Sequence, residues 1–163
     1  MTGSEFKILR EYLGITLLLA AQSLGVTQRQ VQHVETENRK IPLQYARFIY
    51  EMQEKFNNDL DILIDNTPHL DKDTLLIIRY VNNDDLHLFG PEKLRYHPAN
   101  YYNALVRSAI LLMQLNQKKW KSVYFSRRSY QKWLYNREHS AELLYQWART
   151  LIDYLAVENL HVL

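Results

Sequence analysis

Residues 26–42 read VTQRQVQHVETENRKIP and concentrate side chains that can recognise nucleic acid. Arginine can donate two hydrogen bonds to the acceptors of guanine in the major groove, and a glutamine amide can pair with adenine. Basic side chains nearby can bind phosphate oxygens, which positions a protein on nucleic acid without reading its sequence. The question is then whether the chain can present these residues from one rigid element.

No residue pattern typical of catalysis is present in the sequence. The six histidines include no pair at positions i and i+4 and no HExxH motif, so no zinc site is expected. Neither a glycine-rich phosphate loop nor a nucleophile elbow occurs. His87 and His97 flank an acidic patch and are interpreted as surface histidines. We therefore expect no enzyme, no metal and no cofactor.

Four helices are expected in residues 1–56, and the second and third form a helix-turn-helix. The first spans 5–13 between a cap at Ser4 and a left-handed Gly14, and the fourth follows Pro42. Thr16 and Thr27 are predicted to cap helices at 17–24 and 28–35. The turn requires a small residue, a glycine with positive φ four residues later, and two apolar residues that seat the third helix. The sequence supplies all four, as Ala21, Gly25, Val31 and Val34.

This block resembles the phage-repressor and Cro-like helix-turn-helix proteins, whose pattern reads TQxxIxxxENGxRxP, and the resemblance covers residues 6–56. It implies binding of double-stranded DNA. The positions that match base-reading residues of the family are Gln28, Arg29, Gln32 and His33. Those that match residues near the phosphates are Thr27 and Gln30, and those in the loop that grips the backbone are Asn38, Arg39 and Lys40. The alternative is a four-helix bundle that shares the spacing, or a copy that makes only protein contacts.

The chain departs from the family pattern in two places. The second helix opens with three leucines, Leu17, Leu18 and Leu19, where the family has polar residues that touch phosphate. Because successive helical residues are about 100° apart, at least one of these leucines is expected to be covered by the second half of the chain or by another subunit. The glycine expected after Glu35 is also missing, and Asn38 is the residue predicted to take a positive φ.

The second half changes pattern and predicts a small β component. A fifth short helix is expected at 58–65, then a buried strand at 73–81, a short helix at 84–89 and a long helix at 98–116. A second strand follows at 121–126, and helices capped by Ser129 and Ser140 complete the chain. Strand, helix and strand imply two parallel strands. The fold class is therefore mainly α with a small β component. We expect a helix-turn-helix domain at 1–67 and an α/β dimerisation domain at 68–163.

Most of the chain also resembles a small bacterial family that includes the uncharacterised YdiL-like proteins and the anti-CRISPR-associated autoregulators of the second type. The resemblance rests on IRY at 78–80, DDLHLFGPE at 84–92, VYF at 123–125, YQKWL at 130–134, NREHS at 136–140 and QWA at 146–148. His139 stands where an acidic residue is expected. The resemblance implies that the first half binds an inverted repeat and the second half holds a dimer together, and some members are implicated in RNA binding.

The ten basic residues and no acidic ones between positions 93 and 137 suggest a second nucleic-acid surface. Cations alternating with aromatic rings are one way in which single-stranded nucleic acid is bound. The cations are Lys118, Lys119, Lys121, Arg127, Arg128 and Lys132, and the rings are Trp120, Tyr124, Phe125, Tyr130 and Trp133. The favoured alternative is that the rings belong to the core and the cations form a solvated face.

A stripe on the last helix predicts a homodimer. Leu143, Trp147 and Leu151 share one face by their i, i+4 spacing. A second copy could bury this face, and the alternative is that it closes the core of the monomer.

The apolar run at 14–21 is eight residues long, whereas a membrane span needs about 20 apolar residues, and Glu5 and Glu11 lie where a signal peptide would be basic. We therefore expect neither a membrane span nor a signal peptide here. With no cysteine, a cytoplasmic location is expected. The leading hypothesis is a homodimeric transcriptional repressor or autoregulator on a palindromic operator. The alternatives are an antitoxin-type module that binds a partner protein through its second half, and a regulator that also binds RNA.

Overall fold

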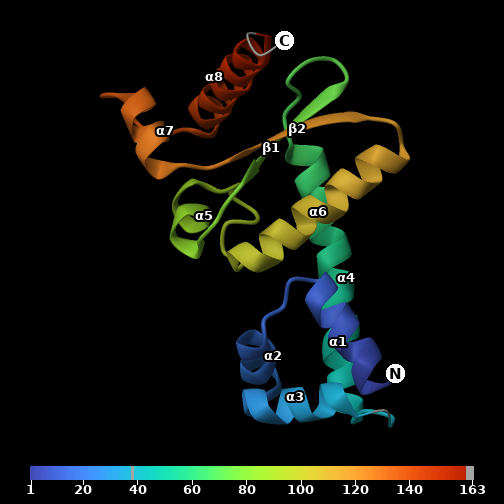
Figure 1. The fold of residues 1–163 in the computed structure, drawn as a ribbon. Helices are drawn as coiled ribbons and strands as arrows, with labels where there is room; N and C mark the ends of the chain where they lie inside the picture. Colours follow the sequence, from blue (N-terminus) through green and yellow to red (C-terminus); the bar gives the residue numbers. More distant parts are fainter. Residues whose placement is uncertain (38, 161–163) are drawn as a thin grey trace.

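The computed structural model describes residues 1–37 and 39–160, and it confirms a mainly helical fold with one small sheet (Figure 1). Side chains are described up to Tyr154. The first half contributes four helices, and the second half contributes two strands and four further helices within the described residues. In Figure 1 the sheet lies between α8 and α6, and α1 to α3 gather around the first half of α4.

Three short helices open the chain, each capped by a threonine. They are α1 (Gly3–Tyr12), α2 (Leu17–Leu24) and α3 (Gln28–Thr36). The predicted bounds of α2 and the caps of α2 and α3, Thr16 and Thr27, are confirmed, and Gly25 ends α2 with a φ of 65°. The third helix begins at Gln28 as predicted and ends one residue later than predicted, at Thr36. The predicted cap of α1 at Ser4 is wrong: Thr2 is the cap, because Glu5 three residues later completes a capping box with it.

The three leucines that open α2 divide between core and solvent. Leu17 and Leu19 are partly buried and pack against the hydrophobic core, whereas Leu18 is 52% exposed. Two of the three leucines are therefore covered within the monomer, and Leu18 is left at the surface.

Gly14 allows the turn between α1 and α2 to pack against the second half of the chain. Its φ is 69°, in the left-handed region that was predicted for it. A Cβ at this position would overlap the backbone carbonyl of Asn100 and crowd the side chain of Ala104. The residue is therefore required both for its backbone conformation and for a close approach to the start of α6 (Ala99–Leu115).

The fourth helix, α4 (Leu43–Asn66), is one continuous helix of 24 residues. The prediction of a separate fifth helix at 58–65 is wrong, because no glycine or proline interrupts the chain between Pro42 and Pro68. Apolar residues continue to recur at helical spacing across the predicted break, as Ile49, Phe56 and Leu63. Pro42 itself is the N-cap of α4 and lies just outside the first turn.

The sheet has two parallel strands, β1 (Thr74–Arg79) and β2 (Lys119–Tyr124), as predicted. Their register pairs Thr74 with Lys119 and Arg79 with Tyr124, so β2 begins two residues before its predicted start. The crossover contains α5 (Asn83–Phe89) and α6. Both α6 and α8 contact both strands, which gives this small sheet the support that two strands need.

Two helices complete the chain, α7 (Arg127–Leu134) and α8 (Ala141–Leu160). The predicted cap at Ser129 is wrong, since the Ser126 hydroxyl accepts the bond from the Ser129 backbone N–H. Ser140 caps α8 as predicted, by accepting from the backbone N–H of Leu143 at 3.2 Å.

One contiguous hydrophobic core runs through both halves of the chain, from Phe6 in α1 to Ala148 in α8. At the junction, Phe56 of α4 contacts the rings of Tyr12 and Tyr101. No described helix combines the length and apolar character required to cross a membrane.

The junction also contains a polar cluster around Asp59, which is 6% exposed. The Tyr101 hydroxyl donates to this carboxylate at 2.8 Å, and His97 Nε2 lies 3.1 Å from it. The interpretation of His97 as a surface histidine is therefore wrong. Burial lowers the pKa of His97, and Asp59 partly opposes that shift. The cluster joins α4 to the start of α6.

Candidate nucleic-acid interface

One face of α3 carries the predicted base-reading residues together and exposed. Gln28, Arg29, Gln32 and His33 are all exposed, and the opposite face is buried through Val31 and Glu35. Arg29, Gln32 and His33 line a shallow depression whose other members are Thr27, Gln30 and Thr36. The helix period therefore separates a polar surface from an apolar one, as the spacing predicted.

The first turn of α3 is fixed by a capping box. The Thr27 hydroxyl accepts from the Gln30 backbone N–H at 3.2 Å, and Gln30 Oε1 accepts from the Thr27 backbone N–H at 2.8 Å. The Gln30 side-chain oxygen is thus occupied at the start of the helix, while its amide nitrogen remains a potential donor on an exposed side chain. Both residues lie beside the exposed face, where the resemblance placed them.

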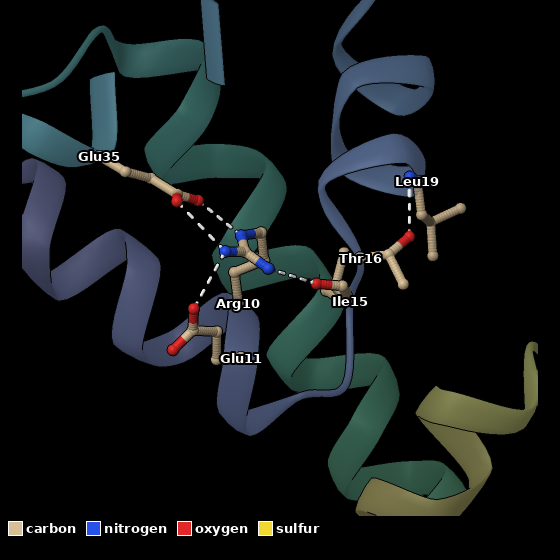
Figure 2. A network of polar contacts seen from close by, with 6 residues as sticks. All are labelled: Arg10, Glu11, Ile15, Thr16, Leu19 and Glu35. Carbon is tan, nitrogen blue, oxygen red and sulfur yellow. Dashed lines mark hydrogen bonds and ion pairs between the residues drawn. The ribbon is translucent and has the colours of Figure 1, made fainter. Parts of the chain in front are cut away.

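A buried ion pair holds the last turn of α3 against α1 (Figure 2). Arg10 Nε donates to Glu35 Oε1 at 2.5 Å and Arg10 Nη2 to Glu35 Oε2 at 3.1 Å, in a bidentate arrangement. The two side chains are 6% and 5% exposed. Arg10 Nη1 also donates to the Ile15 carbonyl at 2.7 Å, which attaches the α1–α2 turn to the same guanidinium.

The sequence analysis missed this pair, although a signal for it was present. Arg10 lies four residues after Phe6 and three before Leu13, so it belongs to the apolar face of α1. Glu35 lies four residues after Val31, on the buried face of α3. A charge on an apolar face must be paired when it is buried, and each of these residues is the other's partner.

The segment after α3 contains a second, exposed carboxylate–guanidinium pair. Arg39 donates to Glu37 through Nε at 2.6 Å and Nη2 at 3.0 Å. Hydrogen bonding to Arg39 lowers the pKa of Glu37. His33 Nδ1 lies 3.4 Å from the same carboxylate, and Lys40 is exposed. Asn38, for which a positive φ and a backbone contact were predicted, lies outside the described residues.

The second predicted nucleic-acid surface is only partly assembled. Five of its six cations are exposed, namely Lys118, Lys119, Lys121, Arg128 and Lys132. The sixth, Arg127, is half-buried and bonded to Asp85 at 2.6 Å. Of the aromatic rings, Phe125 and Tyr130 are buried in the core, and Tyr124 is exposed. Two of the five rings thus belong to the core, as the favoured alternative predicted, and the five exposed cations are compatible with either interpretation.

The stripe on α8 faces the interior of the monomer. Trp147 is 1% exposed, and its ring contacts Phe125 and Tyr130. Leu143 and Leu151 are partly buried and pack against the same core. The stripe therefore closes the monomer's own core, which was the alternative interpretation, and Trp147 cannot contact a second subunit in this conformation.

Neither a scan against models of protein families nor a search of curated proteins found a match to the chain. Among the described residues, no three His, Asp or Glu side chains gather in a way that could hold a metal ion.

Proposed function

We propose that the protein binds double-stranded DNA sequence-specifically through the exposed face of α3 and acts as a homodimeric transcriptional repressor or autoregulator. The observation that supports this most directly is the face itself. Four exposed side chains with hydrogen-bonding capacity for base edges lie on one short helix, and that helix is fixed from behind by the Arg10–Glu35 pair. A recognition helix needs this combination of exposed polar contacts and a rigid support.

Charge beside α3 supports the same proposal. Arg39 and Lys40 follow the helix and can bind phosphate oxygens on the strand that borders the groove. Glu37 occupies Nε and one N–H of Nη2 on Arg39, so Arg39 can present its full set of donors to phosphate only after it leaves that carboxylate. Glu37→Gln is therefore expected to strengthen binding to all DNA sequences.

The homodimer follows from how few bases one helix can read. Two copies reading half-sites about one helical turn apart, ~34 Å, would supply the affinity that one α3 lacks. Light scattering on the full chain is expected to give the mass of a dimer. A monomer at tens of micromolar protein would contradict this part of the proposal.

Selection of bound sequences from a random DNA library tests the proposal as a whole. An inverted repeat is expected to be enriched, and a library without any enriched motif would contradict the proposal. Arg29→Ala is then expected to cost ~1–3 kcal/mol on the selected site and to relax the preference at one base pair. Arg39→Ala is expected to weaken all sequences about equally and to reduce the salt dependence.

The control for both variants is Lys93→Ala, which removes one exposed positive charge from the loop after α5. Its affinity for the selected site is expected to match that of the unmodified chain. If Arg29→Ala and Arg39→Ala lose affinity uniformly across sequences, the assignment of Arg29 to a base contact is wrong.

A further inference from the structure

A cleft of about 430 Å³ lies where the α1–α2 turn meets the second half of the chain. The last turn of α1 and the residues that follow it form one wall, through Arg10, Glu11, Gly14, Ile15 and Thr16. All of them except Gly14 are drawn in Figure 2. The other wall is formed by the end of β1 and the first turns of α6. Its residues are Arg79, Asn100, Asn103 and Arg107. The close approach of Gly14 to Asn100 holds the two walls together.

Two arginines of this cleft have no carboxylate partner. The side chains of Arg79 and Arg107 form no ion pair or hydrogen bond with any residue that the structure describes, and Arg79 makes only a cation–π contact with Tyr124, at 4.7 Å. By contrast, Arg10 is bonded to Glu35, and Glu11 lies 3.3 Å from Arg10. The cleft lining holds three arginines, and the carboxylates beside them are those of Glu11 and Glu35, so the net charge around the cleft is positive.

Two buried polar atoms in the same wall are left without a hydrogen-bond partner. They are Arg79 Nε, a donor, and Asn103 Oδ1, an acceptor. The Asn103 amide group is oriented by its bond from Nδ2 to the Tyr80 carbonyl at 2.6 Å, so its oxygen faces away from that carbonyl. Because buried polar groups are almost always paired, this wall offers one donor and one acceptor that the described residues leave unused.

We propose that this cleft binds a phosphate group, with Arg79 and Arg107 donating to its oxygens and Asn103 Oδ1 accepting from a hydroxyl of the ligand. Guanidinium groups match the geometry of phosphate and form short, charge-assisted hydrogen bonds with it. The hydroxyl is supplied by a protonated phosphate oxygen or by an adjacent sugar. The phosphate could come from the DNA backbone or from a free phosphate ester, and the chemistry at the cleft is the same.

The first measurement is calorimetric titration of the full chain with inorganic phosphate at constant ionic strength. Saturable binding to one site is expected. Arg107→Gln is expected to weaken it about tenfold, because it removes hydrogen bonds to a charged group. Arg107 is exposed, so this variant is expected to fold. The matched control is Lys93→Gln, which removes the same charge outside the cleft and is expected to change the affinity less than twofold.

The second measurement identifies the source of the phosphate, with duplex DNA carrying the selected site as the probe. If Arg107→Gln also weakens DNA binding and makes the slope of log K against log salt concentration shallower by about one, the ligand is a backbone phosphate. If DNA binding is unchanged while phosphate binding is lost, the ligand is a free phosphate ester. Either outcome supports the cleft as a phosphate site.

The proposal is overturned if the unmodified chain shows no saturable phosphate binding and Arg107→Gln leaves DNA binding intact. It is also overturned if Arg107→Gln and Lys93→Gln bind phosphate equally well. Only the DNA measurement depends on the proposed function. A chain that binds phosphate through Arg107 but binds no DNA would contradict the proposed function and support the cleft.

Discussion

The Arg10–Glu35 pair offers a sharp test of what holds α3 in place. Glu35→Gln keeps the size of the side chain and removes its charge, so Arg10 is left as a buried cation. Removing one partner from a buried pair costs about 3–5 kcal/mol. Arg10 keeps its bond to the Ile15 carbonyl at 2.7 Å and its contact with Glu11 at 3.3 Å. These contacts place the expected loss at the lower end of that range.

A loss near the lower end of that range is large for this chain. Domains of this size are stable by about 5–15 kcal/mol, and each kcal/mol shifts the melting temperature by about 2–4 °C. We therefore expect Glu35→Gln to lower the melting temperature by roughly 6–12 °C. Urea denaturation followed by circular dichroism measures the free energy directly.

The control uses the other carboxylate–guanidinium pair. Glu37→Gln removes a carboxylate that also binds an arginine through two bonds, but at the surface beside Arg39. Its denaturation midpoint is expected to match that of the unmodified chain, because exposed pairs contribute little. If Glu35→Gln is as harmless as Glu37→Gln, the buried pair does not support α3. The double variant Arg10→Met with Glu35→Leu is expected to recover stability, since no unpaired charge is left.

Two further predictions concern backbone strain and pH. Gly25→Ala is expected to cost about 1 kcal/mol for its positive φ alone, since its Cβ would meet nothing within 4 Å. Gly14→Ala is expected to cost more, because its Cβ would also overlap Asn100; equal losses in thermal melts would contradict the close approach. Burial lowers the pKa of His139, whose Nδ1 lies 2.8 Å from the Tyr130 hydroxyl. The folded chain therefore binds a proton at His139 less readily than the unfolded chain does. The contribution of His139 to the free energy of unfolding is fully present above about pH 6.5 and is lost as the pH drops through the lowered pKa. In His139→Gln the free energy of unfolding, measured by urea denaturation, is expected to fall less between pH 7.5 and pH 5.5 than it does in the unmodified chain.

The first half of the fold was predictable where its signals are local. The caps Thr16 and Thr27 and the left-handed Gly25 act within a few residues. Accordingly, α2 has its predicted bounds, and α3 begins where predicted and ends one residue later. The cap of α1 was misassigned to Ser4 although a local signal was present, since the pair Thr2 and Glu5 forms a capping box.

The features that could not be predicted depend on distant parts of the chain. Arg10 and Glu35 are 25 residues apart, and only the fold brings their two apolar faces together. The stripe on α8 is another example, because its spacing shows that Trp147 is buried but not what buries it. The cleft residues Arg79 and Arg107 belong to different elements, and no spacing in the sequence connects them with Thr16.

The continuous α4 changes how the two halves of the chain relate to each other. A break at residue 57 would have left the helix-turn-helix on a flexible connection, but α4 contacts α1 and α2 near one end and α6 near the other. The Tyr12 hydroxyl is bonded to Ser108 of α6 at 3.1 Å, so α1 is fixed to the second half as well. Arg10 in that same helix lines the cleft and binds Glu35 of α3. Because one side chain contacts both places, a ligand in the cleft that moved Arg10 would also move the support of α3. Linkage then requires that binding at α3 change the affinity of the cleft by the same factor.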